Sequence, residues 1–186
     1  PVARMGRALA GQPLAIGANA TARLTNKLMA QRTQLDDGRW HFQHGPIDIV
    51  IGARGRADAM QAGHTRAWAR FTTILEELVS ELATLRQPVA QDCALTGEIA
   101  RRMWRACQPH SKVFITPMAA VAGSVAEELI ACYAMDGIKS AWVNNGGDIA
   151  LHLMPGETLR IGLYADLARL DAREIQNGVN VDGQFE

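Results

Sequence analysis

The stretch that decides the fold begins Phe114-Ile-Thr-Pro-Met-Ala-Ala-Val-Ala-Gly-Ser-Val-Ala-Glu-Glu128 and ends Ala141-Trp-Val-Asn-Asn-Gly-Gly-Asp-Ile-Ala-Leu-His-Leu153. It joins a Thr-Pro helix start, a helix of small residues and a strand that breaks at a glycine pair. No other part of the sequence concentrates so many residues that expose the backbone. The stretch is therefore either a ligand cradle or a well-formed supersecondary unit.

The first half of this stretch predicts a helix over residues 116–135. Thr116 is a favoured N-cap residue, and Pro117 suits the first helical position. Asp136-Gly137 supplies a stop at the other end. One face of the predicted helix carries only small residues, namely Ala119, Ala122, Gly123 and Ala126. We expect a neighbouring backbone or a flat ligand to approach this face closely.

The second half predicts two strands joined by a turn. Residues 140–144 form a short strand, and Asn145-Gly146-Gly147 turns the chain. Apolar residues then recur with a period of two, at Ile149, Leu151 and Leu153. This period predicts a half-buried antiparallel strand with those three side chains facing the core.

Upstream, the sequence predicts a further hairpin and a third strand. Strands at residues 28–35 and 39–43 flank Asp36-Asp37-Gly38, a sequence typical of tight turns. Residues 47–51 are almost continuously apolar and predict a strand in the sheet interior. We expect residues 52–63 to be a connection.

Two helices follow this connection. An apolar stripe at spacings of three and four predicts the first helix, with Pro88 as its stop; the stripe contains Trp68, Phe71, Leu75, Leu78, Leu82 and Leu85. The second helix spans residues 96–107 and carries Arg101, Arg102 and Arg105 on one side. We interpret that side as an exposed, solvated basic face.

Beyond the opening stretch, residues 159–163 and 177–183 predict the last strands.

Strands in hairpin order with helices grouped between them predict an α+β fold, an antiparallel sheet with helices packed on it. We expect residues 1–25 to be a loose N-terminal segment. We expect residues 26–186 to form a single domain, truncated at its C-terminus.

Composition excludes several classes of function. The 186 residues carry 19 basic and 19 acidic side chains, so no nucleic-acid partner is expected. No apolar run is long enough to span a bilayer, so no membrane role is expected either. Three cysteines without a Cys-x-x-Cys spacing favour a reduced, cytoplasmic location and no metal site. We expect Cys107 and Cys132 to pack on helix faces.

The Asn144-Asn145-Gly146-Gly147-Asp148 turn has two interpretations. Two glycines let consecutive amides point into one concavity, which suits a diphosphate, while Asp148 accepts ribose hydroxyls or assists Mg²⁺. The alternative is an ordinary hairpin turn, because Asn-Gly is a common hairpin signal. The motif alone favours the ordinary turn.

Other polar residues give weaker signals. The helix start at Thr116 is a possible anion site. Ser124 lacks the context of a nucleophile elbow, so we interpret it as a packing residue. His41 and His44 should face opposite sides of a strand, which disfavours a shared metal.

The opening stretch also carries a family resemblance. The segments at residues 115–127 and 143–149, with 41–50 and 101–107, resemble the ApbE-like superfamily of FAD:protein FMN transferases. They are most similar to an uncharacterised branch whose genes often lie beside those of tetrahydromethanopterin-linked one-carbon metabolism. The resemblance covers the chain from about residue 35 to residue 183 and implies a T-fold-like domain.

The resemblance implies a cofactor site. The residues placed in it are Thr116, Met118, Ala119, Gly123, Asn145, Gly146, Gly147 and Asp148. In the transferases the matching residues help to hold FAD, and Mg²⁺ supports cleavage of its diphosphate. The transferases usually have lysine where this chain has Ala122, and the catalytic residues here are unknown.

Three functions follow as hypotheses. The first is binding of a flavin or pterin-type cofactor, serving tetrahydromethanopterin-linked metabolism. The second is Mg²⁺-dependent transfer of FMN from FAD to a protein, and the third is a non-catalytic structural or assembly subunit. Exposed edges of a small antiparallel sheet would also favour a homodimer.

Overall fold

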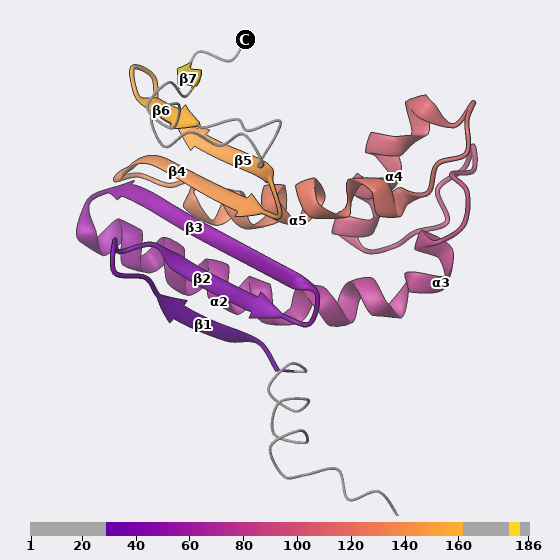
Figure 1. Cartoon of the computed structure of the whole chain (residues 1–186), viewed down its shortest axis with the longest axis horizontal. Coiled ribbons are helices and arrows are strands. Elements are labelled where there is room, and N and C mark those ends of the chain that lie inside the picture. The colour runs from indigo at the N-terminus through magenta and orange to yellow at the C-terminus, as the bar shows by residue number, and fades with distance from the viewer. Residues whose placement is uncertain (1–28, 162–178, 183–186) are drawn as a thin grey trace, which may run out of the picture.

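A five-stranded antiparallel sheet forms the centre of the protein, seen in a computed structural model that describes residues 29–161 and 179–182. The strands lie in the order β1-β2-β3-β4-β5, and they are β1 (Gln31–Gln34), β2 (Trp40–His44), β3 (Ile47–Gly55), β4 (Ile138–Asn145) and β5 (Asp148–Leu153). Figure 1 shows helices gathered on one side of this sheet. The predicted α+β class is therefore confirmed.

The helices cover one face of the sheet and extend past one end of it. They are α2 (Ala57–Ser80), α3 (Leu82–Leu85), α4 (Glu98–Cys107), η1 (Gln108–His110), η2 (Pro117–Ala120), α5 (Val121–Ile130) and η3 (Ala131–Tyr133). In Figure 1, α2 runs behind β2 and β3, and α4 lies at the right-hand end. The largest fully buried side chains lie between these helices and the sheet, among them Tyr133, Phe42, Phe71, Ile49, Ile51, Ile74 and Leu129.

The predicted hairpin at Asp36-Asp37-Gly38 is confirmed, with Gln34 paired to Trp40 across it. The predicted connection over residues 52–63 is wrong. β3 continues to Gly55, and α2 begins two residues later. Gly52, which suggested a loop, instead lies opposite Trp142 on β4, and a Cβ at Gly52 would overlap the Trp142 indole. The glycine therefore admits a large neighbour inside a regular strand.

The predicted single helix over residues 116–135 is also wrong. The chain forms a short 3-10 helix, then α5, then another 3-10 turn, and the break before α5 falls at Ala120, whose φ is −106° and ψ is 13°. The side chain of Thr116 makes no capping hydrogen bond. A Thr-Pro start was visible in the sequence, but the length of the helix after it was not.

The burial of β5 differs from the predicted alternation. Ala150 packs against the core, whereas Ile149 is 36% exposed. In register, Ala150 faces the fully buried Val143, and Leu151 faces Trp142 on the outer side of the sheet. The apolar residues of β5 therefore face away from the helices, and the small and polar residues face toward them.

A second, two-stranded sheet pairs β6 (Thr158–Ile161) with β7 (Val179–Asp182), as the sequence predicted for the last strands. Residues 1–25, expected to be a loose segment, lie outside the described residues. Within the described ranges, no helix is long and apolar enough to cross a membrane.

The predicted packing of the cysteines and histidines is confirmed. Cys107 is 2% exposed, and Cys132 packs against the core. His41 bonds Asp48 at 2.8 Å on the outer face of the sheet, whereas His44 is buried on the helix-covered face. The two histidines therefore cannot share a metal ion.

Candidate functional site

α5 and β5 bring two of the predicted site residues together. A Cβ built on Gly123 would lie 3.6 Å from Oδ2 of Asp148. Both residues line a cavity of about 630 Å³, together with Arg102, Ala106, Ala120, Ser124, Glu127, Ile130, Ile149, Ala150 and Leu151. We name this space the Gly123–Asp148 cavity. Its volume falls within the range of about 300–1,000 Å³ that is usual for ligand pockets.

The absence of a side chain at Gly123 lets Asp148 lie close to α5. The carboxylate of Asp148 approaches the helix backbone at a position where no side chain intervenes. The sequence predicted that a neighbouring backbone or a flat ligand would approach the helix here; at Gly123 the group that approaches is the Asp148 side chain. The carboxylate thus lies against the helix at Gly123, at one side of the cavity.

The glycine turn itself lies outside this cavity. Gly146 and Gly147 both have positive φ, 64° and 109°, and they form the two-residue loop between Asn145 and Asp148. The backbone N–H of Gly147 donates to Oδ1 of Asn144 at 2.9 Å. The turn is exposed, and its geometry is that of the ordinary hairpin turn that the motif favoured.

Met118 and Asn145 line a different cavity of about 320 Å³ with mostly apolar walls. Its lining includes Val121, Ala122 and Val125, which lie on another face of α5 from Gly123 and Ser124. The predicted site residues are therefore divided between two faces of one helix.

Thr116 and Ala119 line neither of these two cavities. The backbone N–H of Ala119 donates to the carbonyl of Thr116 at 3.1 Å, within a 3-10 helix of four residues. The anion site expected at Thr116 needed the start of a long helix, which is not present there.

Arg102 supplies the positive charge in the Gly123–Asp148 cavity. Its Nε lies 3.2 Å from Glu127, and its Nη1 donates to Glu128 at 2.9 Å and to the carbonyl of Ser124 at 3.0 Å. The side chain is only 22% exposed, so the predicted solvated basic face is wrong for Arg102. It is a structural arginine that joins α4 to α5, and none of these contacts uses Nη2.

Glu128 links this arginine to α2. Its carboxylate accepts a second hydrogen bond from Nε of Arg70 at 2.7 Å, and Arg70 also pairs with Glu77. Burial alone would raise the pKa of Glu128, but the hydrogen bonds from Arg70 and Arg102 outweigh burial and hold its pKa below the usual value. Glu128 is therefore ionised at neutral pH and fixes the wall of the cavity.

Sequence reasoning missed Arg102 and Glu128. Glu128 and Arg102 lie 26 residues apart, and no local spacing signals their contact. The one available hint was the position of Glu127 and Glu128 on a helix that follows an arginine-rich helix.

The cavity offers two carboxylates, Glu127 and Asp148, to a cation. Among the described residues, no group of three or more His, Cys, Asp or Glu side chains could hold a metal ion. Mg²⁺ commonly takes one or two carboxylates and completes its shell with water and ligand phosphates. Any Mg²⁺ here would therefore be bound together with a phosphorylated ligand.

One protein family shares the sequence of this fold and site. The sequence model of a family described as "AbpE bacteria" matches residues 31–183. The chain belongs to this ApbE-related family. The matched range contains the whole five-stranded sheet, both cavities and the β6–β7 pair.

Two curated relatives are similar over a shorter segment. A UPF0280 protein of Methanocella arvoryzae is 41% identical over 68 residues, which are 37% of this chain and 26% of that protein. A UPF0280 protein of Methanothrix thermoacetophila is 41% identical over 61 residues, 33% of this chain and 25% of that protein. The matched segments thus span about a quarter of each relative's length.

Proposed function

We propose that this ApbE-related protein binds a flavin or pterin-type ring in the Gly123–Asp148 cavity. The observation that carries the proposal is the cavity of about 630 Å³ that Gly123 and Asp148 line together, with the Asp148 carboxylate within contact distance of the bare helix position. The cavity is large enough for a planar ring that lies beside the helix and the strand, with the Asp148 carboxylate at its edge. Both ring types also carry N–H groups that can donate a hydrogen bond to a carboxylate.

The walls of the cavity suit such a ligand. Ala120, Ile130 and Ala150 supply apolar surface, while Asp148, Glu127 and Arg102 supply polar groups. A few placed polar groups on an otherwise apolar wall are typical of small-molecule sites. The family resemblance supports the same location, because Gly123 and Asp148 match positions that hold FAD in the transferases.

A second candidate is Mg²⁺-dependent transfer of FMN from FAD to a protein. Glu127 and Asp148 favour it, since two carboxylates beside one cavity can share Mg²⁺ with a diphosphate. Ala122 opposes it, because transferases usually carry lysine at that position. Ala122 here lines the apolar cavity, and its carbonyl accepts a hydrogen bond from Asn145. Two further hypotheses come from the sequence. One is a role in tetrahydromethanopterin-linked one-carbon metabolism, and the other is a purely structural role.

Binding of FMN, FAD and a fluorescent pterin to the full chain tests the proposal. Substitution Gly123→Leu should fill the cavity and weaken binding at least about tenfold, since a lost ring contact costs about 1.4 kcal/mol or more. Ala69→Leu adds the same side chain at an exposed position of α2 and serves as the control. If none of the three ligands binds, or if Gly123→Leu binds as the parent does, the proposal fails.

Transfer is a separate measurement. The protein is incubated with FAD, Mg²⁺ and a threonine-containing acceptor, and covalent FMN is detected by in-gel fluorescence. Binding without transfer would leave the cofactor-binding function standing and remove the transferase candidate. Transfer that is lost in Asp148→Ala would support the transferase instead.

A further inference from the structure

A second groove lies where β3 runs past the end of β2. The last residue pair between these strands joins Trp40 to Ile51, but β3 continues to Gly55 and pairs there with β4 alone. Alternate residues of an antiparallel strand direct their N–H and C=O groups to opposite neighbours. Among the residues that the structure describes, part of the β3 backbone beyond Ile51 therefore has no strand partner on the side of β2.

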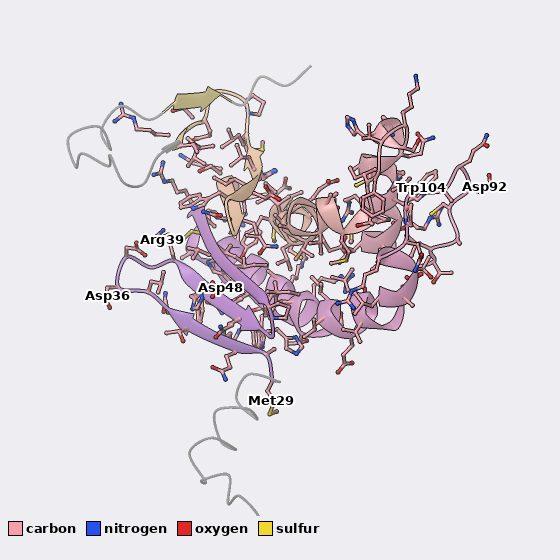
Figure 2. All side chains as sticks on the ribbon, turned by 45° about the vertical axis from the view of Figure 1, so that its right-hand side comes forward. Met29, Asp36, Arg39, Asp48, Asp92 and Trp104 are labelled. Carbon is pink, nitrogen blue, oxygen red and sulfur yellow. The ribbon has the colours of Figure 1, made fainter. Side chains whose placement is uncertain are left out.

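Two adjoining cavities open at this place, of about 690 Å³ and 350 Å³. They share three lining residues, Arg39, Arg54 and Trp142. We name the combined space the arginine groove. Figure 2 places Arg39 near the tip of the β1–β2 hairpin, far from Trp104 on α4. The groove and the Gly123–Asp148 cavity have one lining residue in common, Ile149, and differ in all others.

The groove is positively charged although the whole chain is neutral. Three arginines line it, Arg39, Arg54 and Arg160, and among the described residues Asp37 is the one acidic side chain in its lining. Arg39 pairs with Asp37 at 2.7 Å. Three positive charges and one negative charge leave a net charge of +2, which matches the charge of one phosphate monoester, about −1.5 to −2.

Arg54 belongs to the lining of both cavities of the groove. It is exposed and forms no salt bridge with any described residue. Its Cζ lies 5.8 Å from the centre of the Trp142 ring. Trp142 lies across Gly52, where no side chain separates the indole from the strand. A flat aromatic surface and a guanidinium are thus held side by side.

His64 adds a polar group on the helix side of the groove. Its Nδ1 is hydrogen-bonded to the hydroxyl of Tyr133 at 2.7 Å, and no described residue bonds Nε2. Burial lowers the pKa of His64, so the ring is neutral at pH 7. The Tyr133 contact fixes the ring, and Nε2 is available to a ligand in the space that His64 lines.

We propose that the arginine groove binds a nucleoside monophosphate, with its base beside Trp142 and its phosphate on Arg54. Arginine binds phosphate through paired, charge-assisted hydrogen bonds, and tryptophan offers a flat surface to any base. The unpartnered edge of β3 supplies backbone donors and acceptors for the rim of the base. This inference does not rest on the cofactor site, since the groove shares neither Gly123 nor Asp148.

Calorimetric titration of the full chain with AMP, and separately with adenosine as an uncharged comparison ligand, tests the proposal. AMP should bind at least about tenfold more tightly than adenosine, because a charge-assisted hydrogen bond contributes more than a neutral one. Arg54→Gln should remove this difference. Arg101→Gln removes an exposed charge from α4, outside the groove, and should leave AMP binding unchanged.

Two further variants locate the ligand. Trp142→Leu should weaken AMP and adenosine alike, by about fivefold or more, through the lost stacking. Gly123→Leu, which fills the other cavity, should leave AMP binding as in the parent. Equal affinities for AMP and adenosine, unchanged AMP binding in Arg54→Gln, or a loss of AMP binding confined to Gly123→Leu would each overturn the proposal.

Discussion

The side-chain amide of Asn145 donates to the carbonyl of Ala122 at 3.1 Å and so joins the end of β4 to α5. Asn145 is 9% exposed and stands immediately before the glycine turn that leads to Asp148. The contact therefore fixes the strand hairpin against the helix next to Gly123.

Asn145→Ala should lower the free energy of unfolding by about 1–2 kcal/mol, since a buried acceptor at Ala122 loses its donor. Urea unfolding followed by tryptophan fluorescence measures this change. The same variant should weaken any ligand of the Gly123–Asp148 cavity, because the hairpin is no longer fixed to α5. Undiminished ligand binding in a destabilised variant would show that the hydrogen bond has no role in the cavity.

Asn144→Ala is the matched control, one residue away. Asn144 accepts a hydrogen bond from the N–H of Gly147 in an exposed turn, where water can replace it. We expect a loss below about 1 kcal/mol and no change in ligand binding. If Asn144→Ala and Asn145→Ala lowered the free energy of unfolding and ligand binding equally, the Asn145 contact with α5 would matter no more than the contact within the turn.

A pair of alanine substitutions should have opposite effects on stability. Gly147 has a φ of 109°, so Gly147→Ala should cost more than about 1 kcal/mol through backbone strain. Gly123 lies inside α5, and a Cβ there makes only an ordinary contact with Asp148. Gly123→Ala should therefore stabilise the protein by about 0.5–1 kcal/mol, the usual gain for a helix interior. Thermal unfolding of both variants, monitored by circular dichroism, decides whether the signs differ.

Local patterns were enough to predict the strands and the turns that join two pairs of them. The Asp36-Asp37-Gly38 turn and the Asn145-Gly146-Gly147 turn both lie where the sequence placed them, because tight turns depend on the few residues within them. Local sequence also predicted the bounds of α4 to within two residues. Helix and strand lengths were less predictable. Gly52 suggested the end of a strand, but it lies inside β3 because it makes room for Trp142, a residue distant in the sequence.

The candidate site was predictable only in part. Gly123 and Asp148 were identified and lie together, whereas Gly146 and Gly147 lie in an exposed turn and Met118 lines another cavity. Proximity in a sequence motif does not determine on which face of a helix each side chain lies. Arg102 was assigned to a solvated surface because its partner Glu128 comes from a distant helix.

Glu128→Gln should lower the free energy of unfolding by about 2 kcal/mol at pH 7, since it leaves Arg70 and Arg102 without their shared carboxylate. The pKa of Glu128 is held below its usual value of 4.5, so its stabilising effect is complete above that pH. It is lost as the pH falls through the lowered pKa, because the native carboxyl then takes up a proton. The difference between parent and variant should therefore shrink below pH 4.5.

Glu127→Gln is the control for this experiment. The Glu127 side chain is 63% exposed and has a single ion pair with Arg102 at 3.2 Å. Exposed pairs of this kind contribute about 0–1 kcal/mol, so we expect little effect at any pH. A parent-to-Glu128→Gln difference that stays constant from pH 7 to pH 3 would show that the carboxylate is not the source of the stability.

The contact between His64 and Tyr133 predicts a second pH dependence, at higher pH and with the same sign. Burial lowers the pKa of His64 below its usual value of 6.5, so between the two values the unfolded chain binds a proton that the native protein does not. The free energy of unfolding should therefore fall as the pH decreases below 6.5, by at most about 1.4 kcal/mol per pH unit. His64→Gln should flatten this slope, whereas His110→Gln, at an exposed position, should not. Equal slopes for the parent and His64→Gln, measured by urea unfolding from pH 7 to pH 5, would mean that His64 already carries its proton in the folded protein.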